Sequence, residues 1–219
     1  MLKLYGFAVS NYFNMVKHVL LYKGVEFEEV TVFPGQDPKY LSKSPVGKVP
    51  CIETERGALC ETSVILDYLE ARYPDKPLMP EDAWQQAKVR EVMKIAELYL
   101  ELSGRKLFPQ ALMGKALPEP MKVETREVMQ KACAALAELC SFTPYAMGTE
   151  MTLADIALRY SLVAAEISAQ TVYAWDLAAD VPGMKTWQAM MADSEISQQL
   201  DHASQEMMPA FMEYLQQRA

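Results

Sequence analysis

The hydrophobic periodicity of this chain changes about a third of the way along, and this change constrains the fold most. Residues 1–73 alternate short strand-like runs with segments of helical spacing, in the order β-α-β-α-β-β-α. Three prolines fall within residues 74–82, and beyond them only helical periodicity is found. The pattern predicts an α/β domain over residues 1–75, a linker at 76–83 and an all-helical domain over 84–219.

The individual elements follow from apolar spacing and from the turn residues between them. In the first half we expect strands at 2–7, 27–33, 49–53 and 58–60, and helices at 14–23, 37–41 and 62–72. Gly24 is the expected C-cap of the first helix, and Arg56-Gly57 is the expected hairpin turn before the last strand. In the second half we expect helices at 84–111, 124–141, 153–169, 184–192 and 196–217.

Charge and cysteine usage narrow the functional classes. The net charge of −8 argues against nucleic acid or an anionic membrane as partner. The N-terminus lacks the pattern of a signal peptide, so we expect a cytoplasmic protein. Four cysteines without a CxxC pair, together with only two histidines, predict neither a zinc site nor a redox dithiol. We therefore expect no metal, and reduced cysteines that act as small core residues.

The segment from Gly47 to Ile52 contains a proline at the start of an expected strand. Pro50 cannot donate a hydrogen bond to a sheet, so it suits the first position of a strand. If the Val49-Pro50 bond is cis, the turn would present the backbone N–H and C=O of Val49 to a peptide-like ligand. An ordinary trans proline is the alternative, and the dipeptide alone favours it because few X-Pro bonds are cis.

A second polar segment, Glu61-Thr62, opens the helix expected at 62–72. The Thr62 hydroxyl can cap the helix start, where N–H groups and the positive end of the helix dipole favour a carboxylate. Glu61 can accept a hydrogen bond from an ammonium group. Together they suit an α-amino acid such as the γ-glutamyl end of glutathione, and the alternative is a plain cap beside a solvated glutamate.

Several motifs in combination resemble the glutathione transferase family over nearly the whole chain. They are Leu4-Tyr5 with Ser10, Pro45-x-Gly47-Lys48-Val49-Pro50, Glu61-Thr62-x-Val64-Ile65-x-x-Tyr68-Leu69 and, in the helical half, Gly148-x-x-Met151-Thr152-Leu153-Ala154-Asp155. The last motif predicts a capping box, in which Thr152 and Asp155 bond reciprocally. The resemblance implies a thioredoxin-like domain followed by a helical domain, a detoxification enzyme with glutathione as co-substrate, and a homodimer.

The same resemblance assigns glutathione contacts to positions of this chain. Val49, Pro50, Glu61 and Thr62 are implied to bind glutathione, with Lys48 near its glycyl carboxylate. The family usually has serine where this chain has Thr62. Threonine keeps the hydroxyl and adds only a methyl group, so we expect binding to persist.

Conjugation requires the glutathione sulfur as a thiolate, and the resemblance points to Ser10 as the residue that stabilises it. Ser10 lies between the first strand and the first helix, where its hydroxyl and the helix N-terminus can both lower the pKa of a thiol. The alternative is that Ser10 only caps the helix. Tyr5 lies inside the strand and ranks below Ser10, whereas Asn11 can itself donate to the sulfur. The absence of cysteine at position 10 argues against a mixed disulfide with the protein.

The electrophile is expected over Phe7, Val9 and Tyr12 of the first half, with Tyr99, Phe108 and Met113 as the other wall. Two alternatives to conjugation stay open. The first is a glutathione-dependent reductase of disulfides or peroxides that uses Ser10 and Asn11. The second is a non-catalytic binding protein that keeps the fold and loses the chemistry.

Overall fold

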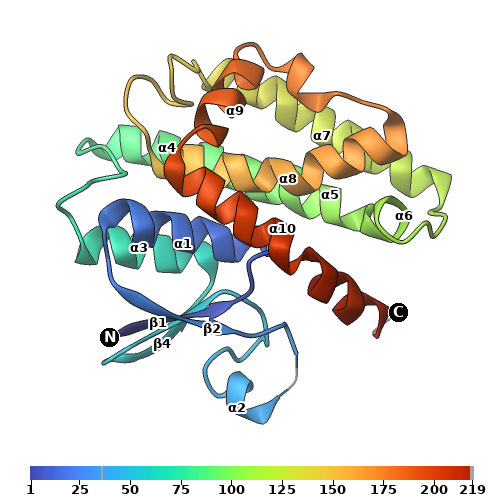
Figure 1. Cartoon of the computed structure of the whole chain (residues 1–219). Coiled ribbons are helices and arrows are strands. Elements are labelled where there is room, and N and C mark those ends of the chain that lie inside the picture. The colour runs from blue at the N-terminus through green and yellow to red at the C-terminus, as the bar shows by residue number, and fades with distance from the viewer. Residues whose placement is uncertain (36, 218–219) are drawn as a thin grey trace. The chain divides into compact units, whose positions relative to one another are not determined.

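The computed structural model describes residues 1–35 and 37–217, and its contacts divide the chain into two units (Figure 1). Met1–Pro77 and the C-terminal segment from Ala192 form the first unit, and Leu78–Met191 form the second. The last helix, α10 (Glu195–Gln216), therefore clusters with the N-terminal unit, whereas the sequence placed it in the helical domain. Leu78, expected in the linker, is buried, and its carbonyl accepts the Leu153 N–H at 2.9 Å.

The first unit contains the four strands and three helices expected from the sequence, and the strands pair in one mixed sheet. The strand order is β2-β1-β3-β4, with β1 and β2 parallel and the other neighbouring pairs antiparallel. The elements are β1 (Leu2–Gly6), α1 (Asn11–Lys23), β2 (Phe27–Thr31), α2 (Pro38–Leu41), β3 (Cys51–Thr54), β4 (Gly57–Cys60) and α3 (Thr62–Arg72). Helices α1 and α3 lie on one face of the sheet and α2 on the other (Figure 1). The predicted thioredoxin-like fold is confirmed.

Two local features place the first helix on the sheet. Ser10 caps α1 at its N-terminus, and Gly24 ends the helix in the left-handed region with φ 70°, as expected. A Cβ atom on Gly6 would lie 2.3 Å from the Phe13 ring, so the missing side chain at position 6 allows the first turn of α1 to return to the end of β1. The β3–β4 turn lies at residues 55–56, one residue before the expected Arg56-Gly57 turn.

In its described residues the second unit consists of helices joined by loops, with one isolated β-bridge between Tyr145 and Gly148, and α8 packs against α4, α5 and α6. Its elements are α4 (Ala83–Ile95), the π-helix η1 (Ala96–Glu101), α5 (Leu102–Lys106), α6 (Phe108–Ala111), α7 (Glu119–Leu139), α8 (Leu153–Tyr173), the 3-10 helix η2 (Leu177–Asp180) and α9 (Met184–Ala192). The single helix expected at 84–111 is thus divided into four pieces. None of the described helices has both the length and the apolar character needed to cross a membrane.

A buried carboxylate fixes the start of α8. The predicted capping box is present: the Thr152 side chain accepts from the first turn, and Asp155 accepts the Thr152 N–H at 2.8 Å. Asp155 also accepts the Ala146 N–H at 2.7 Å and the Trp187 indole N–H at 2.9 Å. The motif therefore ties together the loop before α8, the start of α8 and the helix α9.

Candidate functional site

Ser10 lies at the junction between β1 and α1, where the sequence placed the activating hydroxyl. It is the N-cap of α1 and only 7% exposed, and its Oγ accepts the Phe13 N–H at 3.3 Å. The capping role weighed from the sequence is therefore present. A hydroxyl that accepts a cap bond still has its own hydrogen to donate. Capping and stabilisation of a ligand sulfur are thus compatible in the same side chain.

The loop that carries Ser10 is held by a residue that the sequence analysis did not single out. The Asn14 side-chain N–H donates to the Ala8 carbonyl at 2.8 Å, and the Ser10 N–H donates to the Phe7 carbonyl at 2.9 Å. Among the described residues, the buried Oδ1 of Asn14 has no hydrogen-bond partner. Asn11 is buried beside it as the first residue of α1. A second asparagine three residues after Asn11, in the first turn of α1, was the available signal.

Tyr5, the alternative activator, has its hydroxyl engaged elsewhere in the first unit. The hydroxyl donates to Glu53 Oε2 at 2.5 Å, and Lys43 pairs with the same carboxylate. The Tyr5 ring packs against Tyr40 of α2. Burial, followed by the bond to Glu53, raises the pKa of Tyr5 above its ordinary value. The Tyr5 hydroxyl is therefore paired with Glu53 in the first unit, and its rank below Ser10 as activator stays a prediction.

The expected peptide-binding segment precedes β3. The Val49-Pro50 bond is cis. The carbonyl of Lys48 accepts the Tyr40 hydroxyl at 2.7 Å and the Ser44 hydroxyl at 2.8 Å. These two bonds fix the backbone immediately before Val49 from the side of α2.

The helix start at Glu61-Thr62 differs in one detail from the expectation. Glu61 is the N-cap position, and Thr62 is the first residue of α3, so Thr62 does not cap the helix as expected. Glu61 has φ 68° and ψ 116°, which is an unusual conformation for a residue with a side chain. The Glu61 side chain makes no capping hydrogen bond, so it leaves the first N–H groups of α3 free to bind another acceptor. Such an end favours a carboxylate ligand.

Helix α10 adds an aromatic cluster to the loop after β1, and the sequence analysis missed it. Met207 Sδ accepts the Ala8 N–H at 3.2 Å, and the Phe211 ring stacks on Phe7 at 5.3 Å between ring centroids. The Tyr214 ring stacks on Phe33 at 4.7 Å between centroids. These α10 residues recur at spacings of four and three along the chain, which places them on one helix face. That spacing was visible in the sequence, but nothing in it assigned this face to the first unit.

The expected electrophile residues fall into two groups. Val9 and Tyr12 are half-buried in the first unit, next to the buried Phe7. Tyr99 and Met113 are exposed in the second unit. Phe108 lies beneath the guanidinium of Arg105, at 5.4 Å from the ring centroid. Within the first unit the structure brings Phe7 together with α10, and the joint role of the two groups stays a prediction.

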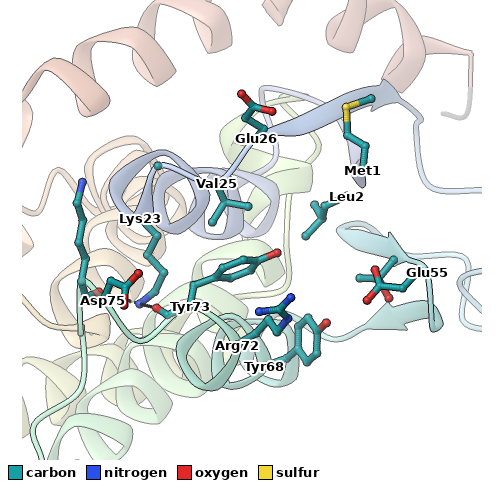
Figure 2. A pocket seen from close by; sticks show the side chains of 13 residues that line it. Met1, Leu2, Lys23, Val25, Glu26, Glu55, Tyr68, Arg72, Tyr73 and Asp75 are labelled. Atoms are coloured by element: carbon teal, nitrogen blue, oxygen red, sulfur yellow. Dashed lines mark hydrogen bonds between the residues drawn. The ribbon is translucent and has the colours of Figure 1, made fainter.

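A hollow of about 540 Å³ lies elsewhere in the first unit (Figure 2). It is lined by the N-terminal residues of β1 and by residues at the C-terminal ends of α1 and α3, among them Lys23, Arg72 and Tyr73. None of the site residues expected from the sequence lines it. Ser10 follows the opposite end of β1, so this hollow is separate from the candidate site.

Comparisons with known proteins point to one family. Residues 4–77 match the family described as the glutathione S-transferase N-terminal domain. The chain is 43% identical to a glutathione S-transferase of Pseudomonas putida, over 98% of each sequence. It is 26% identical to a maleylacetoacetate isomerase of Pseudomonas aeruginosa, over 84% of this chain and 94% of the relative. Its fold matches the crystal structure of a Populus trichocarpa glutathione transferase with a TM-score of 0.79 at 20% identity, over 94% of this chain and 100% of the other.

Proposed function

Because this chain belongs to the glutathione S-transferase family of enzymes, we propose that it activates the glutathione thiol and adds it to a small apolar electrophile. The observation that carries the proposal is the position of Ser10. Its Oγ accepts the Phe13 N–H at the start of α1, which leaves the hydroxyl hydrogen for a ligand sulfur beside the same helix end.

In the proposed complex, the γ-glutamyl end of glutathione lies at the start of α3. Glu61 accepts from the ammonium group, and Thr62 with the first N–H groups of α3 holds the carboxylate. The uncapped helix start and the φ of 68° at Glu61 support this assignment. Val49, at the cis bond to Pro50, pairs with the cysteinyl backbone as an added strand would. Lys48 attracts the glycyl carboxylate.

Activation of the thiol requires a shift in its pKa. A free thiol has a pKa of about 8.5, so about 3% is ionised at pH 7. A pKa of about 6.5 would make roughly three quarters of it thiolate. For this, the site must stabilise the thiolate relative to the thiol by about 2.7 kcal/mol. A hydrogen bond from Ser10 and the dipole of α1 together suffice for this amount, and Asn11 adds a second donor on the same helix end.

The electrophile is proposed to lie against Phe7 and the aromatic face of α10. The stacked pair of Phe7 with Phe211 and the half-buried Val9 and Tyr12 support an apolar substrate. Tyr99, Phe108 and Met113 of the helical unit are proposed to supply the opposite wall. By analogy with the family, we also propose that the protein is a homodimer located in the cytoplasm.

Ultraviolet difference spectroscopy of bound glutathione against pH tests the proposal. In the natural protein we expect a thiolate band that titrates well below the pKa of free glutathione. Ser10→Ala should return that titration towards the value in solution, whereas Tyr5→Phe should leave it unchanged, because the Tyr5 hydroxyl donates to Glu53. Saturable binding without a lowered thiol pKa in the natural protein would refute the proposed chemistry.

The similarity to a relative named maleylacetoacetate isomerase favours a second candidate function, glutathione-dependent isomerisation of a double bond. The same thiolate would add to the double bond and leave after rotation, so glutathione would not be consumed. Incubation with an aryl halide, with a maleyl-type acid and with a glutathione mixed disulfide distinguishes conjugation, isomerisation and reduction. Loss of glutathione with the halide alone supports the main proposal, whereas isomerisation at constant glutathione supports the second.

A further inference from the structure

The β3–β4 hairpin brings two cysteines together that are nine positions apart in the sequence. Cys51 and Cys60 are direct partners in the antiparallel register of these strands. The Cα atoms of directly opposed residues in such a pair lie about 4.5–5.5 Å apart. A disulfide requires Cα atoms about 4.4–6.8 Å apart, so the backbone already has the spacing for a bond between them.

Both sulfur atoms also face the same side of the sheet. The Cys60 thiol donates to the Lys43 carbonyl oxygen over 3.3 Å, and the Cys51 sulfur lies 3.7 Å from the same atom. The single Cys51 S–H has a second acceptor in the Ile52 carbonyl, at 3.5 Å. They lie in a small cluster with Tyr5 and Tyr40 beneath α2. The shared acceptor places the two thiols side by side, and neither sulfur is bound in a disulfide in this structure.

We propose that Cys51 and Cys60 form a reversible dithiol–disulfide pair that is oxidised by a small disulfide such as glutathione disulfide, and that oxidation weakens glutathione binding by the adjacent segments. The pair is not of the CxxC type, and it exists only through the register of the hairpin. The coupling to binding rests on the proposed function, whereas formation of the disulfide does not.

The order of the two steps follows from burial. Cys51 is fully buried, whereas Cys60 is partly exposed. Burial, then the neighbouring Cys60 sulfur, raises the pKa of Cys51 to about 12. The Cys60 thiolate therefore attacks the small disulfide first, and one thiol leaves with a proton from solvent. Cys51 then loses its proton and attacks the Cys60 sulfur, and the second thiol leaves. Two protein thiols are oxidised while one small disulfide is reduced to two thiols.

The position of the pair couples it to the proposed glutathione site. Cys51 directly follows Pro50, and Cys60 directly precedes Glu61. In the reduced protein, the Cys60 thiol holds the Lys43 carbonyl in the segment that leads from α2 to Lys48, and the Cys51 thiol is shared between this carbonyl and that of Ile52. A disulfide has no S–H group, so both donors are lost on oxidation. Loss of one or two weak hydrogen bonds beside the site predicts a rise in the dissociation constant of about three- to tenfold.

Formation of the disulfide is tested on the full chain, equilibrated in mixtures of reduced and oxidised glutathione, quenched in acid, alkylated and mapped by mass spectrometry. We expect a peptide linking Cys51 to Cys60 and the loss of two of the four thiols. Cys140→Ala, a matched control that leaves the pair intact, should still form it, and Cys60→Ala and Cys60→Ser should not. Absence of the linked peptide in the most oxidising mixture, or a disulfide-linked dimer in its place, would refute the proposal that Cys51 and Cys60 form a disulfide within one chain.

The coupling is tested by calorimetry with S-methylglutathione, which has no thiol to exchange with the disulfide. The oxidised protein should bind it about three- to tenfold more weakly than the reduced protein. Equal affinity in the two forms would overturn the coupling. A reduced protein that does not bind S-methylglutathione would refute the proposed function and with it the coupling, while the peptide map would still decide the existence of the pair.

Discussion

The carboxylate of Asp155 supports more of the helical unit than a capping role alone would suggest. Its Oδ1 accepts the Ala146 N–H at 2.7 Å and the Trp187 indole N–H at 2.9 Å, and its Oδ2 accepts the Thr152 N–H at 2.8 Å and the Thr152 hydroxyl at 3.1 Å. In Asp155→Asn, one oxygen becomes an NH2 group, which faces two donors in either orientation. Each buried donor left without an acceptor costs about 1–3 kcal/mol, so we expect a loss of about 3–5 kcal/mol.

Guanidinium unfolding followed by circular dichroism measures this loss. Thr152→Ser keeps both the hydroxyl and the N–H and serves as the matched control, with a change of less than about 1 kcal/mol. Trp187→Phe removes one donor, so the Asp155→Asn/Trp187→Phe double variant should lose less than the sum of the single losses, by about 1 kcal/mol or more. A loss in Asp155→Asn below about 1 kcal/mol, or strict additivity, would refute the argument that the carboxylate joins these three segments.

Four further results are expected. Ser10→Ala should lower turnover of an aryl halide at pH 7 by up to about 25-fold, the ratio of the thiolate fractions at thiol pKa values of about 6.5 and 8.5, because the dipole of α1 and Asn11 remain; an unchanged steady-state rate would contradict the role of Ser10. In the native reduced protein, a thiol reagent should modify Cys60 fastest, because burial raises the pKa of the other three thiols to about 12, and equal labelling of all four would contradict this. Phe211→Ala should raise KM for an apolar electrophile and leave KM for glutathione unchanged; a change in the glutathione KM alone would count against the proposed electrophile wall. The hydrogen bond from Lys43 is the largest cause that holds the pKa of Glu53 below its ordinary value. The ionised Glu53 therefore stabilises the fold above the ordinary pKa of a glutamate, and this stabilisation is lost as the pH falls through the lowered pKa. Glu53→Gln should remove this loss from the acid-unfolding profile measured by circular dichroism.

The first unit was predictable because its elements are short and end at residues with strong local preferences. Gly24 ends α1 where the sequence placed the cap, and α3 spans the predicted residues 62–72. Strand ends shifted by one to two residues, as pairing rather than propensity decides where a ladder stops. The expected strand at 27–33, for example, ends at Thr31, where the register with β1 runs out at Gly6.

The helical half shows what periodicity cannot reveal. Apolar spacing over 84–111 is continuous, yet a π-helical turn at Ala96–Glu101 changes the helix face midway. Gly104 then packs so closely on α8 that an added Cβ would lie 2.7 Å from the Ala164 carbonyl oxygen. The membership of α10 in the first unit depends on contacts such as Met207 with Ala8, which span most of the chain and leave no local pattern.

The register of the β3–β4 hairpin determines whether Cys51 and Cys60 lie opposite each other, and the sequence alone does not determine that register. A turn at Arg56-Gly57, as expected from the sequence, would pair Cys60 with Glu53, whereas the observed turn at residues 55–56 pairs Cys60 with Cys51. The two registers differ by two residues, and side chains alternate faces with a period of two. Both therefore bury the same face, so hydrophobic patterning cannot distinguish them. The observed register also brings the residues before Cys51 and after Cys60 to the same end of the hairpin, and these are the two segments proposed to hold glutathione. A variant that moves the turn by one residue should therefore lose the thiol pair and glutathione binding together while the sheet still forms.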